Sequence, residues 1–122
     1  MIKNTIISLT PLIIKHVLYP DISEIESQRG VNEVINLIET NLPQTHKFRL
    51  LIDVSNYSFT TLEARRIWSL KFKMNVDIQR KASFVAIVGP LNKAFNPEKK
   101  WMETTTLNFF EIEQEAQEWL TE

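Results

Sequence analysis

The sequence feature that most constrains the fold of this chain is the segment from Phe48 to Asp53. It reads Phe-Arg-Leu-Leu-Ile-Asp, and serine, asparagine and threonine are frequent in the residues that follow it. Largely apolar runs of this kind are typical of strands that are buried on both faces of a parallel sheet. Such sheets place functional loops at the carboxyl ends of their strands. The segment therefore predicts an α/β fold with a working edge immediately after Asp53.

Further segments of the sequence predict strands. Ala82 to Val88 is a second continuous apolar run, which indicates another strand buried on both faces. Ile6 to Leu9 and Leu12 to Tyr19 are rich in β-branched residues and are separated by a Thr-Pro dipeptide. This pattern predicts two strands in a hairpin, or one bent strand, at an antiparallel edge of the sheet. Leu107 to Phe110 predicts a short last strand.

The first helix is predicted to begin at Val31. Apolar residues recur from that position with the spacing of an amphipathic helix, and Pro43 would end it. In this interpretation Gly30 precedes the helix, and the acidic stretch from Asp21 to Glu26 is its approach.

Three later segments also predict helices. The helix after the central strand would begin near Thr60 or Thr61, where a hydroxyl can accept backbone N–H groups of the first turn. A helix over residues 97–104 would start at an Asn-Pro pair, and a last amphipathic helix would extend from Ile112 to Leu120. The order is then ββαβαβαβα. With right-handed crossovers it predicts a mixed, largely parallel sheet of about five strands with four helices.

Composition limits the classes of protein to consider. The chain has 122 residues, 43% of them hydrophobic, which predicts a single domain over residues 1–122. A net charge of −1 gives no basic field for nucleic acid, and the lack of cysteine excludes disulfides and cysteine-type zinc sites and suits a cytoplasmic protein. We expect no signal peptide, no transmembrane segment, no metal and no cofactor.

Several motifs together resemble one known family. They are the order of elements, the Leu-Leu-Ile-Asp-Val strand with an aromatic residue soon after it, the strand from Ala82 to Gly89, and the ending Phe109-Phe110, Glu115-Ala116 and Trp119-Leu120. In these respects nearly the whole chain resembles SpoIIAA-like proteins, which are related to the STAS domains of anti-sigma-factor antagonists and more loosely to lipid-binding Sec14-type folds. The resemblance implies helices mainly on one side of the sheet, in a small, usually non-enzymatic module for binding or regulation.

The same resemblance bears on regulation by phosphorylation. In phosphorylated STAS antagonists, a serine in the loop between strand and helix accepts phosphate from a kinase. Residues 61–64 lie over that motif and contain no serine. Leu62 cannot accept phosphate, and Glu63 places a fixed negative charge there. The alternatives are a partner-switching protein without the usual phosphoacceptor, a substitute hydroxyl among residues 58–61, and plain helix capping.

Aromatic residues suggest a binding function. The resemblance would place the helix after the central strand beside the helix at 97–104, and their aromatic residues could line a cavity for a small apolar, lipid-like ligand. Core packing and a homodimer interface explain the same residues, and a protein partner is a further alternative. With the residues at the working edge, the candidate ligand-binding residues are Asp53, Thr60, Thr61, Trp68, Phe72, Gly89, Phe95 and Trp101.

Catalysis has weaker support in the sequence. Asp53 could serve a small hydrolase, but no glycine-rich loop or second carboxylate motif accompanies it, and we favour a structural carboxylate that binds its own loop. Gly89 suits either a close approach of a ligand or a plain turn. His16 lies in a predicted strand and His46 in a loop, so we do not expect them to meet at one metal or nucleophile.

Overall fold

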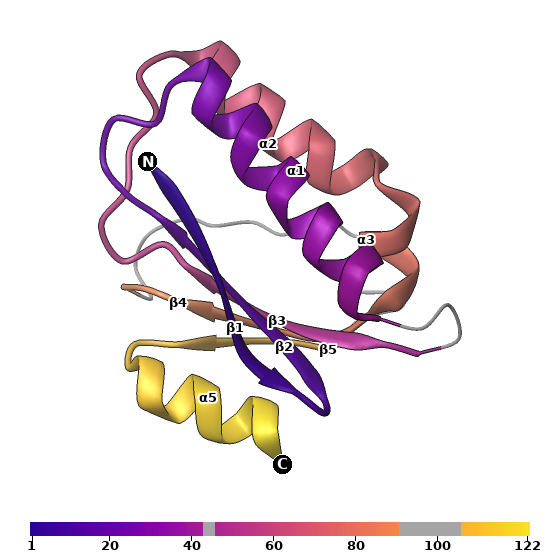
Figure 1. Ribbon diagram of the computed structural model, residues 1–122. Coiled ribbons are helices and arrows are strands. Elements are labelled where there is room, and N and C mark those ends of the chain that lie inside the picture. Colours follow the sequence, from indigo (N-terminus) through magenta and orange to yellow (C-terminus); the bar gives the residue numbers. More distant parts are fainter. Residues whose placement is uncertain (43–45, 91–105) are drawn as a thin grey trace.

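The described residues form one sheet with helices on both of its faces (Figure 1). The structure is a computed structural model that describes residues 1–42, 46–90 and 106–122. Its elements, in chain order, are β1 (Ile2–Leu9), β2 (Leu12–Leu18), α1 (Glu24–Asn41), β3 (Phe48–Asp53), α2 (Leu62–Met74), α3 (Val76–Lys81), β4 (Ala82–Val88), β5 (Thr106–Phe110) and α5 (Glu113–Thr121).

The strands lie in the order β1-β2-β3-β4-β5. β1 and β2 pair antiparallel, whereas β2, β3, β4 and β5 pair parallel to one another. The prediction of a mixed, largely parallel sheet of about five strands with an antiparallel edge is therefore confirmed. The parallel strands also end at a common edge, as the segment from Phe48 to Asp53 predicted.

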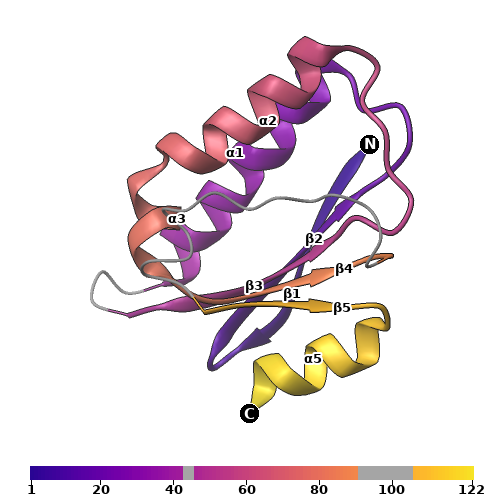
Figure 2. The same cartoon turned by 180° about the vertical axis from the view of Figure 1, so that it is seen from behind.

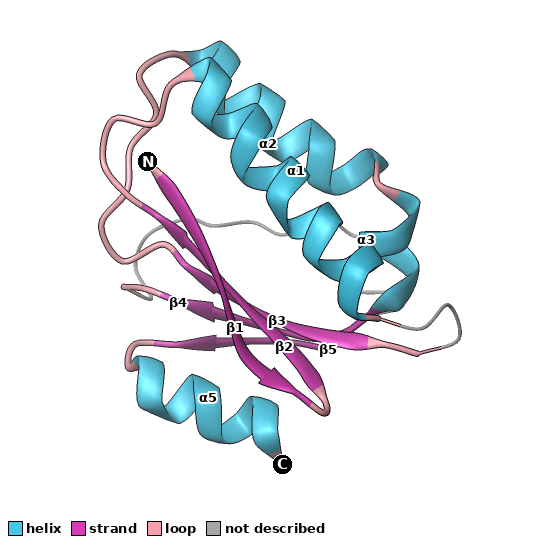
Figure 3. Cartoon of the chain, in the orientation of Figure 1, coloured by secondary structure: helices cyan, strands magenta, loops and turns pink. Residues whose placement is uncertain are grey.

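The sheet separates two apolar layers. Helices α1, α2 and α3 lie over one face and α5 over the other, as Figures 1 and 2 show from opposite sides and Figure 3 shows by element type. Alternation along β2 sends Ile14 and Leu18 to the larger layer and Ile13 to the smaller one. His16, two residues from both Ile14 and Leu18, is fully buried as well.

Polar contacts tie both ends of α5 to the sheet. Near its start, the Lys15 ammonium of β2 lies 2.6 Å from the Glu113 carboxylate. Near its end, the Arg49 guanidinium of β3 donates a hydrogen bond to the Leu120 carbonyl. A cation at the carboxyl end of a helix is favoured by the helix dipole. These contacts join the helix to β2 and β3.

Helix α1 begins at Glu24 rather than at Val31, so the predicted start was wrong. Ser23 caps the helix: its hydroxyl accepts the Glu26 backbone N–H at 3.1 Å, and the Glu26 carboxylate accepts the Ser23 N–H at 3.4 Å. Together these bonds form a capping box, which satisfies backbone donors of the first turn. Glu24 and Glu26 of the acidic stretch are thus part of the helix, whereas Asp21 precedes it.

Gly30 lies inside α1, where the helix packs closely against β1. A β-carbon at position 30 would lie 2.7–2.8 Å from three atoms of the Ile2 side chain, one of which is the β-carbon of Ile2. Glycine is therefore required here by the close approach of two elements, and it does not mark the start of a helix.

We expect Gly30→Ala to lower the free energy of unfolding by about 2 kcal/mol, because the cost of overpacking exceeds the gain in helix propensity of about 1 kcal/mol. Urea unfolding followed by circular dichroism measures the change. In an Ile2→Ala background the same substitution should cost less, since two of the three closest atoms, Cδ1 and Cγ2 of Ile2, are gone and only the Ile2 β-carbon remains. An equal cost in both backgrounds would contradict this explanation.

The predicted order of helices is not confirmed. Residues 97–104, predicted as a helix, lie outside the described residues, as do the candidate residues Phe95 and Trp101. Helix α3 was not predicted, because its short apolar pattern merges with that of α2. Asn75 separates the two helices: its side-chain oxygen accepts the Ile78 N–H at 2.9 Å and caps α3.

Candidate functional site

Two loops lie side by side at the edge where the parallel strands end. Ile22, between β2 and α1, pairs with the segment around Phe59, between β3 and α2. The Ile22 N–H donates to the Ser58 carbonyl and the Thr60 N–H donates to the Ile22 carbonyl, each at 2.9 Å. Asp21 adds a bond from its N–H to the Ser58 hydroxyl at 2.8 Å. These bonds hold the β3–α2 loop in place.

The end of this loop is the start of α2. Thr61 is its N-cap, as predicted, and its hydroxyl accepts the Ala64 N–H at 3.0 Å. The same hydroxyl donates to the Glu24 carboxylate of α1 at 3.2 Å. The capping interpretation of this segment is thus confirmed, and the cap also connects the starts of α1 and α2.

A hollow of about 480 Å³ lies along the β3–α2 loop. We call it the β3–α2 pocket. The pocket is open to solvent, and several of the residues that line it are exposed. The residues that line it are Tyr57, Ser58, Phe59, Thr60, Thr61, Leu62 and Arg65.

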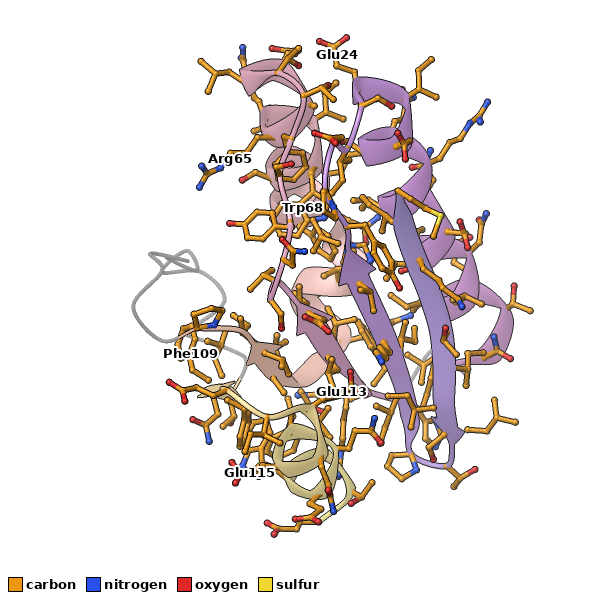
Figure 4. The ribbon with its side chains drawn as sticks, turned by 90° about the vertical axis from the view of Figure 1, so that its left-hand side faces the viewer. Glu24, Arg65, Trp68, Phe109, Glu113 and Glu115 are labelled. Carbon is orange, nitrogen blue, oxygen red and sulfur yellow. The ribbon has the colours of Figure 1, made fainter. Side chains whose placement is uncertain are left out.

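Two side chains on the first turn of α2 form the outer rim of the pocket. Leu62 is 88% exposed, more than any other exposed large apolar side chain among the described residues. Arg65 is also exposed and points out from α2, on the side away from α1 (Figure 4). Within the described part of the chain, its guanidinium makes no hydrogen bond or ion pair. By contrast, Arg66 pairs with Glu63 at 3.8 Å.

The inner wall of the pocket is aromatic and continues into the core. The Tyr57 and Phe59 rings meet edge to face with their centres 6.0 Å apart. Phe59 in turn contacts the Trp68 ring at 6.1 Å, and Trp68 contacts Phe72 at 5.0 Å. Trp68 and Phe72 are buried between α2 and the sheet. The pocket wall is therefore supported from behind by core side chains.

Trp68 also belongs to a buried polar network. Its indole N–H donates to His16 Nε2 at 2.9 Å, and His16 Nδ1 lies 2.6 Å from the Asn4 side-chain oxygen. The Asn4 amide nitrogen donates to the Gly30 carbonyl at 2.9 Å. An indole can only donate, so Nε2 must accept and the proton must be on Nδ1. We call these four residues, Gly30, Asn4, His16 and Trp68, the His16 network. The network joins β1, β2, α1 and α2.

The His16 network holds its imidazole uncharged. His16 has no exposed surface, and burial lowers its pKa from 6.5 to about 3. Both ring nitrogens already have partners in the neutral form, so an added proton on Nε2 would face the Trp68 N–H. The group is thus a structural element and is poorly suited to exchange protons near neutral pH.

The structure separates most of the predicted site residues from the pocket. Thr60 and Thr61 line it. Asp53 is not among the lining residues, and its carboxylate accepts the Ser55 N–H at 2.9 Å, as a loop-capping aspartate does. Gly89 lies where a β-carbon would come within 3.1 Å of the Val54 side chain, so close packing of the chain explains the glycine.

The remaining candidates do not gather at one site. Trp68 and Phe72 are in the core layer under the pocket, and their role as ligand contacts stays a prediction. His46 is exposed whereas His16 is buried. Among the described residues, no group of three histidine, cysteine, aspartate or glutamate side chains could hold a metal ion. No helix in this part of the chain is both long and apolar enough to cross a membrane.

Sequence reasoning missed the residues that form most of the pocket. Arg65 was not among the predicted site residues, although it follows the predicted cap Thr61 by four residues and therefore lies on the same face of α2. Tyr57 gave no comparable signal, because an aromatic residue in a loop is common, and Leu62 was noted only as a residue that cannot accept phosphate.

Comparison with known proteins supports the fold alone. No model of a known family matches the chain, and no curated protein matches it. One solved structure that does match is an uncharacterized protein of the DUF3478 family with a SpoIIAA-like fold, from Shewanella loihica PV-4. It matches with a TM-score of 0.64 over 98% of this chain and 92% of that chain, at 16% sequence identity. The SpoIIAA-like fold that the sequence indicated is therefore confirmed.

Proposed function

We propose that this chain is a non-catalytic, STAS-related binding module that holds the apolar part of a small ligand in its β3–α2 pocket. The observation that carries the proposal is an open hollow of about 480 Å³ with an aromatic inner wall, at the edge where the parallel strands end. Its volume lies within the range of about 300–1,000 Å³ that is usual for ligand sites.

The location differs from a cavity between the helices. Trp68 and Phe72 face His16, with ring centres 6.1 Å and 5.2 Å from the imidazole, and they are in the core. Their contribution in this proposal is to support Phe59 from behind. The pocket wall is then rigid, which lowers the entropy that a ligand must lose on binding.

A binding test can use the neutral apolar dye phenylnaphthylamine, whose fluorescence rises in apolar surroundings. We expect the dye to bind, and Leu62→Ser to weaken its binding about five-fold, because a rim side chain that would be covered by the ligand is removed. Leu70→Ser is the matched control, since Leu70 is an exposed leucine of the same helix that does not line the pocket. Failure of the dye to bind, or equal effects of the two variants, would count against the proposal.

A second candidate is a partner-switching protein that lacks the usual phosphoacceptor serine. The exposed Leu62 favours it, because this side chain occupies the position that the resemblance gives to the regulatory motif and would suit a protein contact. Co-purification with a regulatory protein that is lost in Leu62→Glu would support this candidate. Sedimentation of the purified chain would test whether the partner is a second copy of itself.

A further inference from the structure

The described lining of the β3–α2 pocket carries a single formal charge, and that charge is positive. Arg65 is the one charged side chain among the described residues that line the pocket. Two acidic side chains lie close by but do not line the pocket: Glu24 accepts the Thr61 hydroxyl from the α1 side, and Glu63 pairs with Arg66. An anionic group at the opening would therefore meet the Arg65 guanidinium, and no carboxylate of the described lining would repel it.

The position of Arg65 suits a contact with the exposed end of a ligand. It lies one helical turn after Thr61, so its side chain starts on the face of α2 that borders the opening. Figure 4 shows it pointing out from the helix and not into the core. A guanidinium presents a planar pair of N–H donors that fits a carboxylate or a similar anion, which a lysine ammonium does not.

The rest of the pocket favours an apolar or aromatic body. The Tyr57 and Phe59 rings form the inner wall, and Leu62 continues the apolar surface at the rim. The hydroxyls of Ser58 and Thr60 are already used in part to join the two loops, since Ser58 accepts the Asp21 N–H and Thr60 lies 3.3 Å from the Ile22 carbonyl. The surface thus combines an apolar wall with one cation at its edge.

From this arrangement we infer that the pocket selects small amphipathic anions: an apolar or aromatic body that packs on Tyr57 and Phe59, with one carboxylate or similar group held by Arg65. The inference rests on the proposed function, because it specifies the ligand of the same pocket. Arg65 is then the residue that determines the charge of the ligand, and Leu62 contributes only apolar contact.

The test compares two dyes with the same ring system. Anilinonaphthalenesulfonate carries a negative charge, and phenylnaphthylamine is neutral. We expect Arg65→Gln to weaken binding of the charged dye about five-fold and to leave the neutral dye unchanged, since a partly exposed charge-assisted bond is removed. Added salt should weaken binding of the charged dye alone. Arg66→Gln is the matched control, because it removes a neighbouring cation that pairs with Glu63.

The outcomes separate the inference from the proposed function. Amide NMR shifts at residues 57–65 with the charged dye, together with the Arg65 effect, would support the inference. If Arg65→Gln has no effect on the charged dye while the neutral dye still depends on Leu62, the charge selectivity is wrong and the pocket remains a binding site. If shifts with the charged dye fall elsewhere, the inference is also overturned. If neither dye binds, the proposed function itself fails.

Discussion

Replacing Trp68 by alanine is expected to lower the free energy of unfolding by about 4 kcal/mol, the usual cost of removing a buried tryptophan. The indole packs between α2 and the sheet, and its ring contacts His16, Phe59 and Phe72. Alanine would leave a cavity among these rings and remove the donor from His16 Nε2. Urea unfolding followed by circular dichroism measures the loss.

Two further variants identify the cause of that loss. Trp68→Phe keeps a ring in the core but removes the indole N–H, and we expect it to cost about 1–3 kcal/mol because a buried acceptor loses its partner. Trp119→Ala removes a partly buried tryptophan on the α5 side, where it packs on Phe84 and Phe110, and should cost less. A cost below about 1 kcal/mol for Trp68→Ala would show that this ring does not support the core.

The strands could be predicted from the sequence because their signals are local. Ala82 to Val88 is apolar except for Ser83, and the structure buries most of this strand between the two helical layers. The Thr61 cap is also a local signal, since a hydroxyl needs only the N–H groups of the following turn. Such features require no knowledge of distant residues.

Helix α1 shows where local reasoning gave a wrong answer. The capping box of Ser23 and Glu26 is visible in the sequence, but Gly30 weakened the helical pattern and was interpreted as its boundary. The reason for a glycine at that position is Ile2, which is distant along the chain and meets α1 only in the folded protein. A requirement set by tertiary packing overrode the local preference of glycine.

The pocket and the His16 network also depend on contacts between residues that are far apart in the sequence. Alternation along β2 places His16 inward with Ile14 and Leu18, and this much could be inferred from the sequence. Its partners could not, because Asn4 comes from the neighbouring strand through the β1–β2 register, and Trp68 comes from α2 through helix packing. Arg65 likewise became a candidate only when the paired loops at Ile22 and Phe59 defined the hollow beside it.

Acid should destabilise the protein through His16 before most carboxylates titrate. The folded pKa of His16 is lowered from 6.5 to about 3 by burial, so in this interval the unfolded chain binds a proton that the folded chain does not. The stability is therefore complete above the unfolded pKa and falls as the pH decreases through the interval. One pKa unit corresponds to about 1.4 kcal/mol, so we expect a loss of about 2 kcal/mol between roughly pH 7 and pH 5.

The measurement is urea unfolding at these two pH values, and the quantity to compare is the difference between them. His16→Gln cannot titrate, so its difference should be close to zero whatever its absolute stability. His46→Gln removes the exposed histidine outside the His16 network and should keep the full difference. If wild type and His16→Gln lose the same free energy, protonation of His16 is not the cause. A difference confined to proteins with His16 would instead show that the buried network limits stability in acid, since its imidazole must remain neutral to accept the Trp68 N–H.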